Sequence, residues 1–369
     1  MKVLVNRYLY KFKEMLPENV TVDFFDAEQF PNQANTYDAL FLNTTTPIND
    51  TTLPDPGKIS FIGTGSAGDD HINKEYLKQQ NIQFANAVGC NAKSVAEFVM
   101  TALLCWSVER EKSLQDSKVG IVGVGNAGQQ LTALLNTFSI PYVEYDPPRH
   151  QRESGFKSDH FDQLMDCNIL TFHTPLTSTG DYPTHHLLNK SWFSDKNFDL
   201  IINTARGGIV DETVLLKELN SGALSDTIID VWENEPAFNA KLAKRSLFAT
   251  PHIAGYSIQA KLRASKMIVD AFCDHFDLPK KEMSEPEKFT PTLNGEYSSL
   301  AQILQDLHPI STYDNALKSL IETGIENRGK LFRTMRSTMQ LRNEFSNTFI
   351  PDHYLKTYPE LSLLGIQPK

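Results

Sequence analysis

The sequence predicts an α/β protein with two parallel, doubly wound sheets and a further unit at the C-terminal end. Strand-like apolar runs alternate with helical segments in residues 1–90, and the same rhythm returns after residue 118. A glycine-rich turn joins a strand to a helix at residues 118–128, a recurrent feature of doubly wound folds. A chain of 369 residues is also too long for one ordinary domain, so we expect two or three.

The first part of the chain predicts a five-stranded sheet. Its apolar runs lie at residues 2–5, 20–24, 39–43, 59–62 and 82–84. Small polar residues follow two of these runs, in the loops 43–46 and 63–68, where parallel sheets bind ligands. Gly, Ser and Thr are also common in ordinary turns, so both interpretations stay open. Residues 91–108 predict a long buried helix, and 258–276 predict a helix that packs back on this first part.

The glycines at the start of the second part predict a dinucleotide-binding loop. A strand at Val119–Val122 is followed by Gly123, Gly125 and Gly128 in a G-x-G-x-x-G pattern, and a helical segment comes next. The first glycine allows a tight turn, the second lets the backbone approach a pyrophosphate, and the third lets helix pack on strand. The helix N-terminus then offers free N–H groups to the phosphates.

Asp146 strengthens this interpretation. It ends a second strand, Tyr142–Tyr145, 18 residues after Gly128, where a carboxylate can accept hydrogen bonds from ribose hydroxyls. Its charge would repel a 2'-phosphate, so the sequence predicts NAD rather than NADP. A glycine turn that binds nothing is the alternative, and Asp146 makes it the weaker one.

Three polar residues that could carry out proton transfer follow later strands of the same part. The remaining strands are predicted at residues 168–172, 199–203, 227–231 and 247–250. Arg206, Glu235 and His252 come just after the last three, so in a parallel sheet they share the edge of the glycine loop. Histidine can move the proton that accompanies a hydride, a carboxylate favours its charged form, and a guanidinium can grip a substrate carboxylate. The other histidines considered, His71, His160, His173, His185 and His186, show no such set.

Composition excludes several classes of function. The net charge of −10 argues against binding to nucleic acid or to a membrane surface, and the N-terminus lacks an apolar signal segment. The four cysteines are widely spaced, so we expect no disulfide framework, no metal site and a reducing, cytoplasmic location.

Four segments resemble the D-isomer-specific 2-hydroxyacid dehydrogenase family. They are G-I-V-G-V-G-N-A-G, N-T-A-R-G-G-I-V-D, D-V-W-E-N-E-P and P-H-I-A-G-Y. The resemblance implies that Arg206, Glu235 and His252 catalyse hydride transfer between NAD and a 2-hydroxy acid, with Glu235 rather than Glu233 as the catalytic acid. It also implies NAD contacts at Gly123, Gly125, Asn126, Ala127, Gly128, Asp146, Thr174, Thr204, Ala205, Arg206, Asp230 and Gly255.

Within the family the chain is most similar to the branch that oxidises 4-phospho-D-erythronate in vitamin B6 synthesis. The similarity is dense over residues 1–280, with F-I-G-T-G-S-A-G-D-D-H-I and L-T-F-H-T-P-L-T among its marks. It implies substrate contacts at Thr44, Ser66 and Tyr256. One departure is Asn43, where the branch carries an arginine.

The resemblance also implies three structural units and a homodimer. These are a discontinuous substrate domain (1–92 and 256–280), an inserted Rossmann-like NAD domain (93–255) and a C-terminal α+β dimerisation domain (281–369). In the last, residues 299–307 and 313–325 have helical patterns, which we expect to be buried against a second copy. Residues 279–291 predict a linker.

The substrate is expected to be a small phosphorylated 2-hydroxy acid. Its phosphate needs a cation, and the C-terminal arginines Arg328, Arg333, Arg336 and Arg342 are candidates that a partner copy could supply. Two alternatives stay open: the same chemistry on glycerate, glyoxylate or 3-phosphoglycerate, and an NAD(H)-sensing binding protein on the same scaffold.

Overall fold

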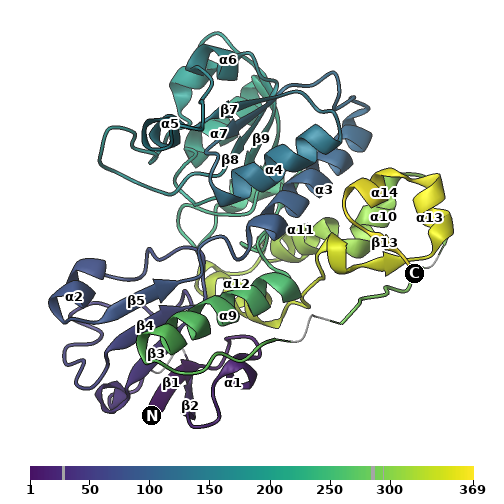
Figure 1. Cartoon of the computed structure of the whole chain (residues 1–369). Helices are drawn as coiled ribbons and strands as arrows, with labels where there is room; N and C mark the ends of the chain where they lie inside the picture. Colours follow the sequence, from purple (N-terminus) through teal and green to yellow (C-terminus); the bar gives the residue numbers. More distant parts are fainter. Residues whose placement is uncertain (27–29, 284–286, 294) are drawn as a thin grey trace. The chain divides into compact units, whose positions relative to one another are not determined.

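The computed structural model describes residues 1–26, 30–283, 287–293 and 295–369. The chain forms two compact units, each described here by itself (Figure 1). Unit 1 comprises Met1–Asn91 and Ser257–Glu287, and unit 2 comprises Ala92–Tyr256 and Lys288–Lys369. Part of the predicted linker, residues 284–286, lies outside the described residues. Within the described ranges, no helix has the length and apolar character needed to cross a membrane.

Unit 1 contains the predicted five-stranded parallel sheet, in the order β2-β1-β3-β4-β5. Its strands are β1 (Lys2–Asn6), β2 (Thr21–Phe25), β3 (Ala39–Leu42), β4 (Phe61–Thr64) and β5 (Gln83–Asn86). Strand order reverses between β1 and β3, which makes the carboxyl ends of these two strands the topological switch point of the sheet.

Alternating side chains bury both faces of this sheet. Phe41 faces α1 (Phe12–Met15) and α9 (Ile258–His275), with its ring centroid 5.3 Å from that of Phe272. Leu40 and Leu42 point the other way, into the core shared with α2 (Lys74–Gln79). Helix α9 therefore returns to the first sheet, as the sequence predicts.

Unit 2 contains a six-stranded parallel sheet in the order β11-β10-β9-β8-β6-β7. Its strands are β6 (Val119–Val122), β7 (Tyr142–Tyr145), β8 (Ile169–Phe172), β9 (Phe198–Asn203), β10 (Leu224–Ile229) and β11 (Phe248–Ala249). Order reverses between β6 and β8, so the glycine loop after β6 stands at the switch point. Both sheets confirm the predicted α/β class.

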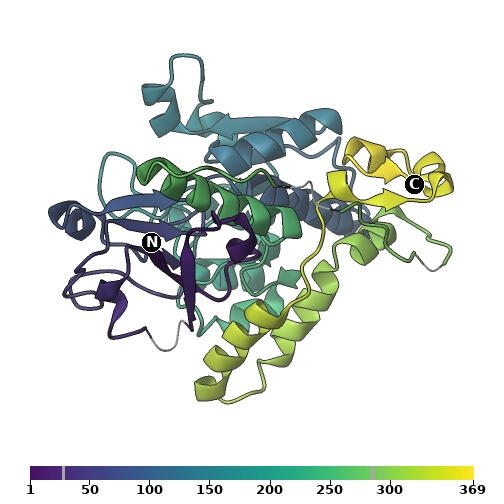
Figure 2. The ribbon, with the colours of Figure 1, turned by 60° about the horizontal axis from the view of Figure 1, so that its bottom comes forward.

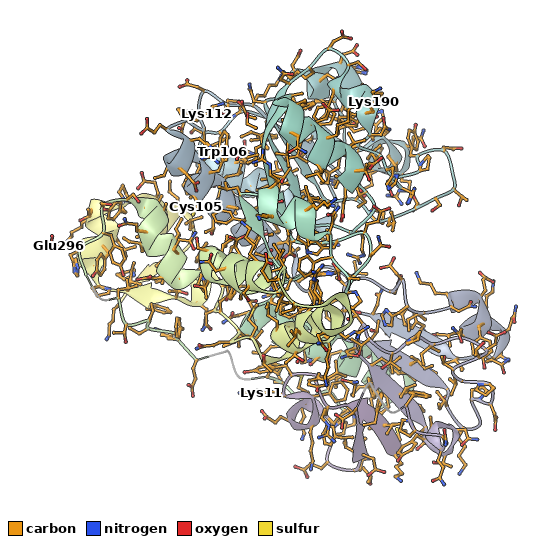
Figure 3. All side chains as sticks on the ribbon, turned by 180° about the vertical axis from the view of Figure 1, so that it is seen from behind. Lys11, Cys105, Trp106, Lys112, Lys190 and Glu296 are labelled. Atoms are coloured by element: carbon orange, nitrogen blue, oxygen red, sulfur yellow. The ribbon has the colours of Figure 1, made fainter. Side chains whose placement is uncertain are left out.

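Helices cover both faces of this second sheet. One core joins the sheet to α3 (Ala92–Arg110) and α4 (Asn126–Thr137), and the other joins it to α6 (Phe161–Met165), α7 (Glu212–Ser221) and α8 (Ala240–Arg245). A short helix, α5 (Pro147–Arg152), follows β7. On α3 the buried Trp106 (Figure 3) donates from its indole nitrogen to Asp226 at 3.0 Å, which fastens the helix to β10.

The C-terminal segment, residues 288–369, packs against the rest of unit 2 in the same chain. Its elements are α10 (Leu300–Leu307), α11 (Ile310–Ser319), α12 (Ile325–Thr338), β12 (Phe349–Ile350), α13 (Asp352–Thr357), α14 (Glu360–Leu363) and β13 (Gln367–Pro368). Ile303 and Leu304 of α10 are fully buried in the core that contains α3 and α4. The expectation that these apolar helices are buried against a second copy is therefore wrong for α10, because α3 already covers its apolar face.

The structure also differs from the single helix predicted at residues 313–325. Two helices, α11 and α12, are joined there by a short turn (Figure 2), and α12 was not predicted. Arg328 donates to the carbonyl oxygens of Leu320, Ile321 and Thr323 at 2.8–3.3 Å, which satisfies acceptors left over where α11 ends.

A buried ion pair fastens the following segment to α3. Arg342 Nη1 lies 2.6 Å from Glu97 Oε2, and both side chains are almost fully buried. Glu97 Oε1 also accepts the backbone N–H of Phe345 at 3.0 Å. This pairing explains how an acidic residue can lie inside an otherwise apolar helix.

Candidate active site

The six strand ends of unit 2 lie in one row. The in-register pairs are Tyr145–Val122, Val122–Phe172, Phe172–Asn203, Asn203–Ile229 and Ile229–Ala249. The loops that leave this row carry every predicted cofactor and catalytic residue. Because parallel strands bind ligands at their carboxyl edge, this row is the candidate site.

The surroundings of the three glycines are compatible with the roles that the pattern predicts. Gly123 has φ of +90°, and a Cβ there would lie 2.7 Å from the methyl group of Thr174. A Cβ on Gly128 would overlap the carbonyl oxygen of Gly123, so helix α4 approaches the strand closely. At Gly125 a Cβ would meet nothing within 4 Å. The open side of Gly125 is the space that a pyrophosphate would take.

The first turn of α4 and two nearby hydroxyls complete the cofactor side. Asn126 is exposed and Ala127 partly exposed at the N-terminus of this 12-residue helix, whose first N–H groups have no partner within the helix. The hydroxyls of Thr174, after β8, and Thr204, after β9, are buried without a hydrogen-bond partner. Unsatisfied donors beside an open glycine loop fit a phosphate-linked dinucleotide.

Asp146 holds the glycine loop as well as facing it. Its carboxylate accepts the N–H of Val124 at 2.8 Å and that of Arg149, at the start of α5, at 2.9 Å. Arg149 in turn donates to the carbonyl of Val124 at 2.7 Å and pairs with Glu153 at 2.8 Å. Arg149, the cationic residue whose N–H donates to Asp146, is thus tied to Glu153.

His252 and Glu235 form the pair expected of them. His252 Nδ1 lies 2.8 Å from Glu235 Oε2 and 3.1 Å from Oε1, and the side chains are 33% and 22% exposed. The N–H of Trp232 also donates to Glu235 at 3.0 Å. Burial alone would raise the pKa of Glu235, but His252, this N–H and Arg336 together hold that pKa below its ordinary value. Glu235 is therefore a carboxylate, and His252 Nε2 is left for a substrate.

Asp230 fixes the backbone that carries His252. Its buried carboxylate accepts the N–H groups of Ile253 at 2.8 Å and Ala254 at 2.9 Å and the hydroxyl of Thr250 at 2.6 Å. His252 itself has φ of +57°, a backbone conformation that residues other than glycine rarely adopt. Strain of this kind persists only where surrounding bonds impose it, and it concentrates at functional sites.

Gly207 brings the Arg206 loop against the loop that carries Glu235. A Cβ on Gly207 would overlap the carbonyl oxygen of Trp232, so the two loops are in backbone contact. Arg206 is partly exposed and donates to the carbonyl of Ala205 at 2.8 Å. Ala205 is buried and its N–H donates to Asn203 at 3.2 Å.

Two neighbouring residues have partners that the sequence did not indicate. His186 Nε2 lies 2.9 Å from Glu233, and the ring of His185 stacks on it with centroids 4.1 Å apart. The possible ligand atoms of these three residues lie within 4.8 Å of one another. The sequence did not indicate this cluster of His185, His186 and Glu233. Glu233 is engaged by His186, which leaves Glu235 to His252.

The surroundings of His173 favour a structural role for this residue. Its Nε2 lies 3.0 Å from the hydroxyl of Thr171, and burial lowers its pKa to about 4. A histidine that stays neutral at physiological pH is suited to hold the loop after β8.

The predicted substrate contacts are divided between the two units. In unit 1, Thr44 is exposed in the loop after β3, and Ser66, after β4, has its hydroxyl 2.9 Å from that of Thr64. In unit 2, Gly255 and Tyr256 follow His252, and the phenol oxygen of Tyr256 accepts a hydrogen bond from Arg336 at 3.2 Å. Arg336 comes from α12, whose presence next to the site the sequence did not predict.

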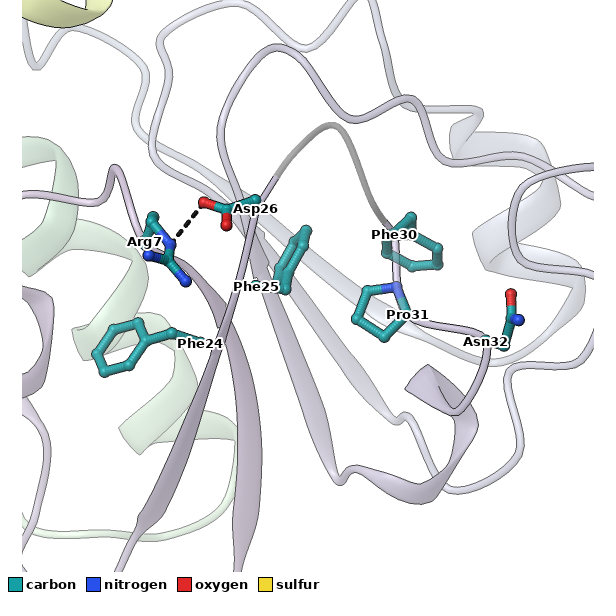
Figure 4. Close-up of a pocket in the computed structure, with 7 residues that line it drawn as sticks. All are labelled: Arg7, Phe24, Phe25, Asp26, Phe30, Pro31 and Asn32. Atoms are coloured by element: carbon teal, nitrogen blue, oxygen red, sulfur yellow. Dashed lines mark ion pairs between the residues drawn. The ribbon is translucent and has the colours of Figure 1, made fainter.

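A surface pocket in unit 1 involves none of these residues. It lies beside β2 and includes the ion pair between Arg7 and Asp26, at 2.5 Å (Figure 4). Its lining consists of Arg7, Phe24, Phe25, Asp26, Phe30, Pro31 and Asn32. We assign the chemistry to the row of strand ends, which holds the paired catalytic groups.

Comparison with known proteins defines the class. The family model described as "D-isomer specific 2-hydroxyacid dehydrogenase, NAD binding domain" matches residues 100–254. That range includes the glycine loop, Asp146 and the pair Glu235–His252, so the cofactor of this unit is NAD.

Two relatives refine the assignment. Erythronate-4-phosphate dehydrogenase of Bacteroides thetaiotaomicron is 37% identical over 310 residues, covering 83% of this chain and 86% of the relative. The enzyme of the same name from Escherichia coli is 35% identical over 364 residues, covering 95% and 94%. The chain belongs to the erythronate-4-phosphate dehydrogenase family of D-isomer-specific 2-hydroxyacid dehydrogenases.

Solved structures support the fold. The D-lactate dehydrogenase of Aquifex aeolicus, complexed with NAD and lactic acid, has a TM-score of 0.61 at 22% identity and covers 74% of this chain and 95% of that one. The D-lactate dehydrogenase of Treponema pallidum has a TM-score of 0.60 at 23% identity and covers 77% and 100%.

Proposed function

We propose that this protein is an NAD-dependent oxidoreductase that converts 4-phospho-D-erythronate to (R)-3-hydroxy-2-oxo-4-phosphobutanoate in vitamin B6 biosynthesis. The observation that carries the proposal is the His252–Glu235 pair at the edge of the NAD-binding sheet. Relatives 33–37% identical over most of the chain bear the corresponding name, which supports the choice of substrate.

His252 acts as the general base. Its Nε2 accepts the proton of the C2 hydroxyl while Glu235, bonded to Nδ1, orients the ring and stabilises the imidazolium. Arg206 binds the C1 carboxylate and the developing carbonyl oxygen, because a guanidinium forms two parallel bonds to a carboxylate. Thr44, Ser66 and Tyr256 are proposed to contact substrate, which is supported by their places in loops after strand ends.

The residues around the glycine loop fit NAD. Gly125 and the first turn of α4 would hold the pyrophosphate, and Asp146 would accept hydrogen bonds from the ribose hydroxyls. The hydroxyls of Thr174 and Thr204 have no hydrogen-bond partner and could bind the cofactor as well. When bound, NAD would supply the acceptor for the hydride of C2, and with the proton taken up by His252 the products would be the 2-oxo acid, NADH and one proton.

Initial rates with a panel of acids test the proposal. We expect kcat/KM for 4-phospho-D-erythronate to exceed that for the unphosphorylated acids D-erythronate, D-lactate and D-glycerate by ~10³-fold, since the phosphate would form several charge-assisted hydrogen bonds. Comparable turnover of the unphosphorylated acids would refute this substrate, and binding of NAD without turnover of any acid would favour a sensor.

Self-association belongs to the same proposal. Leu331, Leu363 and Phe289 of the C-terminal segment are exposed, although α10 is buried in its own chain. We propose that the protein forms a homodimer through this segment, with these three side chains as candidate contacts. Replacing the three residues by serine should convert the dimer to a monomer in sedimentation velocity.

The four cysteines are buried thiols, which supports the proposed cytoplasmic location.

A further inference from the structure

Arg336 is a cation beside the catalytic pair that the structure leaves incompletely bonded. Its Nη2 donates to the phenol oxygen of Tyr256 at 3.2 Å, and the guanidinium lies 5.7 Å from the centre of the same ring. Its Nε is buried and has no hydrogen-bond partner. Guanidinium groups bind planar and tetrahedral anions through several donors at once, so Arg336 has donors available for a ligand.

The packing of α12 fixes this position. A Cβ on Gly329 would lie 3.2 Å from Pro236, so the backbone of α12 runs against the loop that carries Glu235. One turn on, the buried Phe332 stacks on Phe238 with ring centroids 6.0 Å apart. Arg336 follows Phe332 by four residues and so lies on the same face of the helix. The C-terminal segment thereby places a cation in the site from within the same chain.

The surroundings keep Arg336 charged. Burial alone would lower its pKa, but Tyr256, Glu235 and Asp230 raise that pKa above its ordinary value. Glu235 is itself bonded to His252, and Asp230 to the backbone after His252. No carboxylate of the described ranges forms an ion pair with Arg336, so its charge is balanced only at a distance.

The other C-terminal arginines have different tasks. Arg342 is paired with Glu97 in the core, and Arg328 donates to carbonyl oxygens at the end of α11. Arg333 is exposed on α12. In unit 1 the polar loops 43–46 and 63–68 contain no lysine or arginine. Of these candidate groups, Arg336 is the one that combines a positive charge with proximity to the catalytic pair.

We infer that Arg336 binds the phosphate group of the substrate and thereby selects phosphorylated 2-hydroxy acids. The inference rests on the proposed function and names the residue that gives the site its specificity. In this inference α12 of the same chain supplies the cation, whereas the sequence offered a partner copy as one possible source.

Kinetics of Arg336→Met with two substrates test the inference. Methionine keeps the length of the side chain and removes its charge, and Arg333→Met, one turn earlier on the same helix, is the matched control. We expect kcat/KM for 4-phospho-D-erythronate to fall ~100-fold or more in Arg336→Met, mainly through KM, and kcat/KM for D-erythronate, which lacks the phosphate, to fall at least ~10-fold less. Arg336→Lys should recover part of the loss, and Arg333→Met should match wild type.

An equal loss with both substrates would overturn the inference, since it would show that Arg336 binds the carboxylate or positions Tyr256. An unchanged preference for the phosphorylated acid would overturn it as well. Titration with NADH, followed by its fluorescence, shows whether each variant keeps a folded unit 2, because α12 lies outside the glycine loop.

Inorganic phosphate separates this inference from the proposed function. It should inhibit oxidation of D-erythronate competitively in the wild type and at least ~10-fold more weakly in Arg336→Met. If the wild type has no preference for 4-phospho-D-erythronate, the proposed substrate fails, yet the phosphate effect still reports on Arg336. Equal inhibition of both proteins, or of neither, would exclude a phosphate site at this residue.

Discussion

His252 shows how much a single residue in this site depends on its neighbours. Its backbone is in the left-handed region, its ring is held by Glu235, and the chain just after it is bonded to Asp230. These constraints fix the direction of Nε2 before any substrate arrives. Preorganisation of this kind lowers the reorganisation that proton transfer would otherwise require.

Glu235→Gln tests the role of the carboxylate. His252, the N–H of Trp232 and Arg336 outweigh the effect of burial and hold the pKa of Glu235 below its ordinary value, so Glu235 is a carboxylate beside the imidazole. Glutamine keeps an acceptor for the imidazole but removes this charge. We expect kcat to fall ~100-fold, because the imidazolium formed during proton transfer loses its negative partner. An unchanged kcat would show that the carboxylate does not influence the base.

His252→Ala is the companion variant. It should lose nearly all turnover while NAD affinity stays close to wild type, because the glycine loop and Asp146 are untouched. Substantial residual oxidation would mean that another group accepts the proton.

The proposed role of Asp146 is to select between the two nicotinamide cofactors. Its carboxylate would accept ribose hydroxyls and repel a 2'-phosphate, and Arg149 is already engaged by Glu153. We expect the wild type to prefer NAD over NADP by ~100-fold and Asp146→Asn to reduce the preference below ~10-fold. The ratio of the two kcat/KM values cancels any common loss from the weakened Val124 contact. Equal use of both cofactors by the wild type would contradict this role.

Among the elements, the strands were predictable and α12 was not. Buried parallel strands are continuous apolar runs, such as Val119–Val122, and these stand out against polar loops. Helix α12 contains Gly329 and mostly polar residues, and Phe332 is its one fully buried side chain among those described. Its helical state depends on packing against the loop that follows Glu235, 80 or more residues earlier in the chain. Local patterns carry no signal for such a contact.

In the candidate site, too, some residues could be predicted from local patterns and others could not. Glu235 and His252 each follow a strand end, so topology alone brings them to one edge. Arg336 is 80 residues from Tyr256 and lies in no motif, which is why the sequence offered it only as one of four candidate arginines. Likewise, the contact of Gly207 with Trp232 depends on how two loops cross, which strand spacing does not specify.

The glycine loop allows a prediction at the scale of one element. A Cβ on Gly125 meets no protein atom within 4 Å, whereas a Cβ on Gly128 would overlap the backbone of Gly123. Gly125→Ala should therefore unfold at nearly the wild-type temperature but bind NAD at least ~10-fold more weakly, because the methyl group fills the pyrophosphate space. Gly128→Ala should be destabilised by ~1–3 kcal/mol even without cofactor.

Thermal unfolding and NAD titration of the two variants separate these effects, with Gly155→Ala as the control, since Gly155 has open space around it and lies outside the loop. Wild-type NAD affinity in Gly125→Ala would show that the cofactor does not lie over this glycine.

At the scale of the whole molecule, the C-terminal segment is part of unit 2 rather than an appended tail. Its helix α10 completes the core around α3, its helix α12 contributes Arg336, and Arg342 joins Glu97 inside the protein. Truncation after residue 291 should therefore expose the apolar face of α3 and leave Glu97 unpaired. Aggregation of the truncated chain is the expected outcome, in place of a stable NAD-binding monomer.

The Arg342–Glu97 pair provides the sharpest test of this attachment. Removing one partner of a buried ion pair leaves an uncompensated charge, so Arg342→Met should cost ~3–5 kcal/mol of stability. Replacing both partners, by Met and by Gln at residue 97, removes the buried charge and keeps an acceptor for the N–H of Phe345. The double variant should therefore recover most of the loss, although two carbonyl oxygens that Arg342 bonds, those of Asn343 and Ser94, lose their donor.

Chemical unfolding of the four proteins in a double-mutant cycle measures the coupling. Additive losses would mean that the two charges do not stabilise one another, and that other contacts, such as those of α10 and the hydrogen bond of Ser94 to Glu344, hold the C-terminal segment to α3.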